Sequence, residues 1–126
     1  MNKEFVPYEL AVKLKELGFD ELCFGYYLCK NSAFEVRLEI TTNWIDLLPY
    51  DSSSCKAPLY QQAFRWFREK YGLYHQMHNR LIDWGVAIRN IQTADIEWSD
   101  GNYISYEEAE LNCLTKLIEI AEQTNN

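Results

Sequence analysis

Two stretches of the sequence share one pattern, in which a proline opens an amphipathic segment and a glycine follows its last residue. The first segment spans residues 7–17 and precedes Gly18, and the second spans residues 58–71 and precedes Gly72. Proline suits the first turn of a helix, and glycine suits the left-handed residue just past its end. Apolar residues recur in both segments at helical spacing. We therefore expect helices over 7–17 and 58–71, and strands only outside them.

A third helix is predicted near the C-terminus. Ser105 is followed three residues later by Glu108, which is the spacing of a capping box. In that motif each side chain accepts a hydrogen bond from the backbone N–H of the other residue. Leucine and isoleucine then recur at helical spacing, so the pattern predicts a helix over 105–122.

The segments between these helices have the patterns of strands. Residues 34–40, FEVRLEI, alternate between apolar and charged side chains, and residues 22–29, LCFGYYLC, are apolar almost throughout. An alternating strand has one wet face, whereas a uniformly apolar strand is typical of the middle of a sheet. Three more short strands are expected between residues 73 and 103, and an irregular loop over 41–57. The prediction is an α+β fold in the order αββαβββα, with three helices packed on one face of an antiparallel sheet.

Length and composition indicate a single domain over residues 1–126. Apolar residues make up 48% of the chain, which is enough for a core that needs neither metal ions nor disulfides. No apolar run has the length of a membrane span, and the N-terminus lacks the pattern of a signal peptide, so we expect a cytoplasmic protein without membrane contact. The net charge of −7 disfavours a protein whose main task is to grip phosphate backbones.

The sequence lacks the common motifs of catalysis, such as GxSxG, HExxH or a phosphate-binding glycine loop. Its four cysteines have no metal-binding spacing and are interpreted as buried thiols. Cys55 paired with His75 or His78 is the remaining catalytic hypothesis, and nothing in the sequence brings these residues together. We therefore expect a protein that is not an enzyme and that holds no cofactor.

The two histidines have the spacing of an HxxH pair, which on a helix would turn both rings toward one metal ion. Gly72 is expected to end the helix before them, and on a strand His75 and His78 face opposite sides of the sheet. The prediction is one half-buried histidine, one exposed histidine and no metal site.

The outer side of the predicted helix 58–71 is the most distinctive surface, together with aromatic residues of the loop 41–57. The hypothetical contact residues are Arg65, Trp66, Arg68, Glu69, Trp44 and Tyr50. Exposed aromatic residues on loops are typical of surfaces that bind other proteins. The expected partner is therefore another protein, and the oligomeric state is left open.

Charge suggests two alternative functions. The first is nucleic-acid binding through cations in and around the second helix, namely Lys56, Arg65, Arg68, Lys70 and Arg80, although the net charge disfavours it. The second is a mimic of nucleic acid that occupies a host defence protein through acidic residues of the C-terminal third, namely Glu107, Glu108, Glu110, Glu119 and Glu122.

The order of a helix, three strands and a helix over residues 58–123 resembles the double-stranded-RNA-binding fold. The segment SYEEAELNCLTKLIE is similar to the last helix of that family. The family carries lysines at the start of this helix, where this chain has Tyr106, Glu107 and Glu108. Acidic residues there would repel RNA, so the resemblance implies a topology and not a function.

Three distinctive stretches, from both ends and the middle of the chain, are EFVPYELAVKLKELGFDE, APLYQQAFRWFREKYGL and YEEAELNCLTKLIEI. Together they resemble a family of short, uncharacterised proteins from phages, prophages and other mobile elements of Bacteroidetes-type bacteria. The resemblance implies a genomic context, that of a mobile-element accessory protein, and it carries over no catalytic residues.

Overall fold

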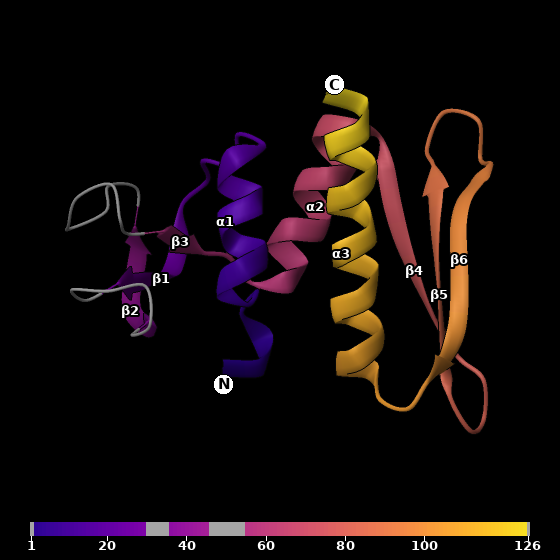
Figure 1. Ribbon diagram of the computed structural model, residues 1–126, viewed down its shortest axis with the longest axis horizontal. Helices are drawn as coiled ribbons and strands as arrows, with labels where there is room; N and C mark the ends of the chain where they lie inside the picture. The colour runs from indigo at the N-terminus through magenta and orange to yellow at the C-terminus, as the bar shows by residue number, and fades with distance from the viewer. Residues whose placement is uncertain (1, 30–35, 46–54, 126) are drawn as a thin grey trace. The chain divides into compact units, whose positions relative to one another are not determined.

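The computed structural model describes residues 2–29, 36–45 and 55–125 (Figure 1). The chain divides into two compact units, Met1–Tyr60 and Gln61–Asn126. The described parts contain three α-helices and two three-stranded antiparallel sheets, which confirms the α+β class. Two details of the expected order were wrong, because the strands form two sheets instead of one and the first unit has a third strand. The single domain over residues 1–126 stays a prediction.

Unit 1 consists of one helix and one sheet after a short 3-10 helix, η1 (Asn2–Glu4). Its elements are α1 (Tyr8–Glu16), β1 (Cys23–Cys29), β2 (Val36–Ile45) and β3 (Cys55–Ala57). The strand order is β2-β1-β3, so the uniformly apolar β1 lies in the middle, as its sequence predicts.

The expected loop over 41–57 was wrong at both ends. β2 continues to Ile45, and β3 adds a strand of three residues that pairs with Gly25 to Tyr27 of β1. A strand of three residues is too short to show any periodicity in sequence. Residues 46–54 lie outside the described part of the chain.

Helix α1 begins and ends where its sequence predicts. Pro7 is the N-cap, and Gly18 follows the helix with a φ of 103°. The hydroxyl of Tyr27 donates a buried hydrogen bond of 2.6 Å to the carbonyl of Val6, and the Tyr8 ring meets the Tyr27 ring edge-on. These contacts hold strand β1 to the segment that leads into α1.

Unit 2 contains two helices and a sheet with the strand order β4-β5-β6. Its elements are α2 (Tyr60–Tyr71, whose first residue closes unit 1), β4 (Leu73–Asn79), β5 (Trp84–Asn90), β6 (Ile96–Tyr103) and α3 (Tyr106–Asn125). The helix, three-strand, helix order of this unit matches the expected topology. Gly72 ends α2 with a φ of 66°, a conformation that glycine adopts without strain.

Both helices of unit 2 lie on the same side of its sheet (Figure 1). Helix α3 packs on all three strands, and the ring of Phe64 in α2 stacks on that of His75 in β4. The largest fully buried side chains of this unit are Phe64, Phe67, Val86, Ile88, Leu114, Leu117 and Ile118. Side chains alternate along a strand, so the opposite face of the sheet carries the residues of the other parity.

The capping box at the start of α3 is present. The Ser105 hydroxyl accepts a hydrogen bond from the Glu108 backbone N–H at 3.1 Å. The Glu108 carboxylate accepts from the backbone N–H of Ile104 at 3.2 Å, one residue before the position that the motif predicts.

Candidate functional site

The polar side of α2 is exposed, as the sequence predicts for Arg65, Arg68 and Glu69. The Arg65 Nε lies 3.7 Å from Glu69 Oε1, which is the expected i,i+4 ion pair. Arg68 has no ion-pair partner among the residues that the structure describes. These three residues therefore share one open strip of the helix.

Trp66 does not belong to that strip, because only 6% of its surface is exposed. Its indole meets the rings of Phe67 and Tyr71 edge-on, with centroids 5.1 and 5.6 Å away, and the Lys70 ammonium lies 5.2 Å from the indole centroid. The apolar side of α2 is thus broader than the stripe of residues at helical spacing indicates. The expectation of an outward-facing Trp66 was wrong.

The side chains of the other two predicted contact residues are not described. Trp44 is part of strand β2, and nothing is described of its side chain. Tyr50 lies outside the described residues. Trp66 is therefore removed from the contact surface expected from the sequence, and a contact role of the other five residues stays a prediction.

The histidines lie as the strand pattern predicts. His75 is half-buried and His78 is exposed, and the two residues lie on opposite faces of strand β4. Burial and, to a smaller extent, the nearby positive charge of Arg68 together lower the pKa of His75 to about 4, so the ring is neutral near pH 7. Within the described parts of the chain, no three His, Cys, Asp or Glu residues are grouped to hold a metal ion.

The described thiols are buried, as expected. Burial raises the pKa of Cys23 and of Cys113 to about 12, so both stay protonated and neither is an activated nucleophile. Cys55 belongs to unit 1 and the histidines belong to unit 2. The side chain of Cys29 is not described.

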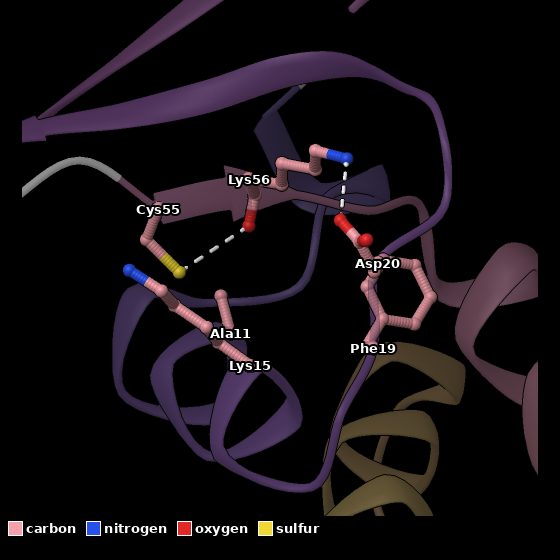
Figure 2. Close-up of a pocket in the computed structure, with 6 residues that line it drawn as sticks. All are labelled: Ala11, Lys15, Phe19, Asp20, Cys55 and Lys56. Atoms are coloured by element: carbon pink, nitrogen blue, oxygen red, sulfur yellow. Dashed lines mark hydrogen bonds and ion pairs between the residues drawn. The ribbon is translucent and has the colours of Figure 1, made fainter. Parts of the chain in front are cut away.

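Cys55 borders a small pocket of unit 1, between α1 and strand β3 (Figure 2). The Cys55 thiol donates to the Lys56 carbonyl at 3.5 Å, and the Lys56 ammonium pairs with the Asp20 carboxylate at 3.2 Å. The pocket has a volume of about 60 Å³, which is far below the few hundred Å³ of a typical ligand site. It has room for about two water molecules and for no organic substrate.

Three of the cations proposed to contact nucleic acid are paired with carboxylates. Lys56 is paired with Asp20, and only 10% of its side chain is exposed. Arg65 is paired with Glu69, and Arg80 makes two hydrogen bonds to the Asp83 carboxylate. Phosphate contacts gain their affinity from free cations, so these pairings weaken the nucleic-acid hypothesis.

Three of the five acidic residues proposed for a nucleic-acid mimic are buried or have a partner within α3 or at its start. Glu110 is 6% exposed, and the Glu108 carboxylate is used in the capping box. Glu119 is paired with Lys116 at 3.5 Å. A mimic of nucleic acid needs its charges on an open face, and Glu107 and Glu122 alone provide little of one.

The most unusual surface feature of unit 2 was not predicted. The hairpin between β4 and β5 carries Leu81 and Ile82 at its tip, and these side chains are 95% and 88% exposed. Leu81 has a φ of 76°, a left-handed conformation that costs a leucine about 1–2 kcal/mol. Two bulky apolar residues at a strained, fully exposed tip contribute almost nothing to folding.

The tip is held by hydrogen bonds within the hairpin. The Asn79 side chain accepts from the Leu81 backbone N–H at 3.0 Å, and the Arg80 backbone N–H donates to the Asp83 carbonyl at 2.9 Å. The Arg80 guanidinium then clamps the Asp83 carboxylate with bonds of 3.0 and 3.1 Å. A bidentate clamp of this kind fixes geometry as well as charge.

A third exposed apolar residue lies at the same end of the sheet. Trp84 pairs with Tyr103 across β5 and β6, so Ile104 follows next to the hairpin, and it is 86% exposed. The one sequence signal for this cluster is the pair of apolar letters in NRLIDW, at a turn where glycine, asparagine or aspartate is usual. We call Leu81, Ile82 and Ile104 the apolar tip.

Comparison of the chain with protein-family models, with curated proteins and with solved structures gives no match. No helix in the described residues combines the length and the apolar character needed to cross a membrane.

Proposed function

We propose that this chain is a non-catalytic protein-binding module and that the apolar tip is its main contact. The observation that carries the proposal is Leu81, a bulky side chain at a strained and almost fully exposed position. Backbone strain that packing does not require is concentrated at functional positions. The context of a phage or other mobile element, and a cytoplasmic location, remain part of the same proposal.

The tip has the properties of an anchor for a pocket on a partner. Interfaces derive most of their binding energy from a few apolar residues that fill a pocket. The hydrogen-bonded hairpin holds Leu81 and Ile82 in place before binding, which lowers the entropy cost of association. The exposed strip Arg65, Arg68 and Glu69 would be a second and weaker contact.

Charge around the tip indicates what surrounds the partner's pocket. Asp83 lies in the hairpin that carries the tip, Asp100 of β6 and Glu107 in the first turn of α3 are exposed, and the whole chain carries a charge of −7. A partner with a basic rim around an apolar pocket fits this surface. Association should then slow as salt is added, because the rim charges steer the encounter.

A photo-crosslinking amino acid at position 82 tests the proposal in the source cells. The matched control carries the same amino acid at Gln92, an exposed residue in the other hairpin of unit 2. We expect one protein adduct at position 82, no such adduct at position 92, and loss of the adduct when Leu81→Asn is added. Equal adducts at both positions would contradict the proposal, and an adduct that nuclease removes would favour nucleic-acid binding instead.

A further inference from the structure

The face of the unit 2 sheet that lies away from α2 and α3 is hollowed. His75, Ile88 and Trp98 are paired across the strands on the helix side, so Gln76, Ala87 and Ser99, paired in the next row, lie on the other side. The hollow has a volume of about 410 Å³, within the range of small-molecule sites. It is separate from the apolar tip.

The floor of the hollow consists of the small residues Ala87 of β5 and Ser99 of β6. Gly85 and Gly101 also line the hollow, and the Arg80 side chain lies over both of them. Longer side chains surround this floor, and they include Gln76, Arg80, Arg89 and Ile96. The floor thus leaves space above the sheet, and the rim offers hydrogen bonds, positive charge and one apolar wall.

Arg89 is the charged group of this hollow that lacks a carboxylate partner in the described parts of the chain. Its Nε donates to Gln76 Oε1 at 2.9 Å, and its Nη1 donates to the Ala94 carbonyl at 2.9 Å. Both acceptors are neutral, so they fix the guanidinium without cancelling its charge. A guanidinium has five N–H donors, and these bonds use two of them.

The turn after β5 fixes the position of one of these acceptors, the Ala94 carbonyl. The Asn90 side chain accepts from the backbone N–H groups of Gln92 and Thr93, and the Ala94 N–H donates to the Asn90 carbonyl. Ala94 takes a φ of 63°, a left-handed conformation, and its carbonyl reaches Arg89. Arg89 is therefore preorganised by neighbours that contribute no negative charge.

We propose that this hollow binds a small organic carboxylate, with Arg89 as its anchor. A guanidinium edge matches the two oxygens of a carboxylate in a bidentate pair. Gln76 uses its oxygen on Arg89, so its amide N–H groups and the Ser99 hydroxyl can bond the ligand. Ile96, 52% exposed on the rim, offers an apolar wall for the rest of the molecule.

The surrounding charges favour a carboxylate over a phosphate. Asp100 also borders the hollow, and Asp83 lies beside it on the Arg80 guanidinium. Arg80 is paired with Asp83, so Arg89 is the cation that a ligand can reach, and with Asp100 the four charges sum to zero. A carboxylate adds one negative charge beside Arg89, whereas a phosphate dianion would add two to a site next to two acids.

NMR titration of the ¹⁵N-labelled full chain tests the proposal with three probes. Benzoate has the carboxylate and an apolar ring, benzamide is its neutral counterpart, and inorganic phosphate is the other anion. We expect saturable shifts with benzoate at the Arg89 Nε–H and at the amides of Ala87 and Ser99, and none with benzamide. Arg89→Gln should weaken benzoate binding about tenfold or more, because it removes a charge-assisted pair.

Arg68→Gln is the matched control, because Arg68 is an exposed arginine of the same unit that also lacks a carboxylate partner in the described chain. It should leave benzoate binding unchanged, and the spectra of both variants report whether the fold is intact. Three results would overturn the proposal: no saturable benzoate shift, benzoate binding that survives Arg89→Gln, or tighter binding of phosphate than of benzoate.

Discussion

The imidazole of His75 stacks on the phenyl ring of Phe64, with ring centroids 3.8 Å apart and planes inclined by 14°. The buried Nδ1 of His75 has no hydrogen-bond partner among the described residues. A polar atom buried without a partner costs about 1–3 kcal/mol. A phenyl ring at this position would keep the stack and remove the cost.

His75→Phe should therefore raise the free energy of unfolding by about 1 kcal/mol at pH 7. The gain should grow in acid, because the folded pKa of about 4 lies below the ordinary value of 6.5. Below pH 6.5 His75 binds a proton in the unfolded chain but stays neutral in the folded chain. The wild type therefore loses stability as the pH falls from 6.5 through 4. Urea unfolding across this range measures the difference. His78→Phe, at an exposed position, should show no such divergence, and parallel pH curves for His75→Phe and wild type would contradict the prediction.

Leu81→Asn should stabilise the protein although it shortens an apolar side chain. Asparagine tolerates a positive φ better than leucine does, and relief of this strain is worth about 1 kcal/mol. Ile82→Asn is the matched control, because Ile82 is almost as exposed but does not have a positive φ. Thermal unfolding should show a higher Tm for Leu81→Asn and an unchanged Tm for Ile82→Asn. Equal Tm values for the two variants would mean that Leu81 is not strained.

Gly101 gives room to the Arg80 side chain. A Cβ at Gly101 would overlap Arg80 Nη2 and lie 2.7 Å from its Cζ, so Gly101→Ala should push the guanidinium away from Asp83 and Asn102. We expect a cost of about 1 kcal/mol in the wild type, and none in the Arg80→Ala background, where alanine has space. Urea unfolding of the four proteins in this double-mutant cycle measures the coupling.

Gly85→Ala is the internal comparison for that cycle. A Cβ at Gly85 would lie 3.3 Å from Arg80 Nε, so the side chain needs to shift only slightly. Its penalty should be smaller than that of Gly101→Ala. If Gly101→Ala cost the same with and without Arg80, the close approach of the two residues would not explain the glycine.

Helix ends were predictable because their causes are local. Gly18 and Gly72 occupy the left-handed positions predicted for them, and Pro7 is the N-cap of α1, one residue before the predicted first helical position. The central place of β1 followed from its apolar composition in the same way. Each of these features is determined by residues close together in the sequence, so it can be predicted from a short stretch.

Features that depend on distant parts of the chain were missed. Trp66 is buried although it lies outside the apolar stripe that spacing defines, and the three residues of β3 form a strand by pairing with β1. The fixed position of Arg89 was also missed, since its hydrogen-bond partners Gln76 and Ala94 come from another strand and a turn. Sequence spacing shows which residues share an element, but not which elements meet.

Ser105→Ala should lower the free energy of unfolding by about 1 kcal/mol, because the hydroxyl caps the Glu108 N–H at the start of α3. The matched control is Thr115→Ala in the middle of the same helix, where the hydroxyl donates to the Leu111 carbonyl at 2.8 Å. That carbonyl also belongs to the helix ladder and alanine has the higher helix propensity, so this variant should be neutral or slightly more stable. Urea unfolding followed by the circular dichroism of the helices compares them. A loss at Ser105 no larger than that at Thr115 would show that the capping box, although formed, does not stabilise α3.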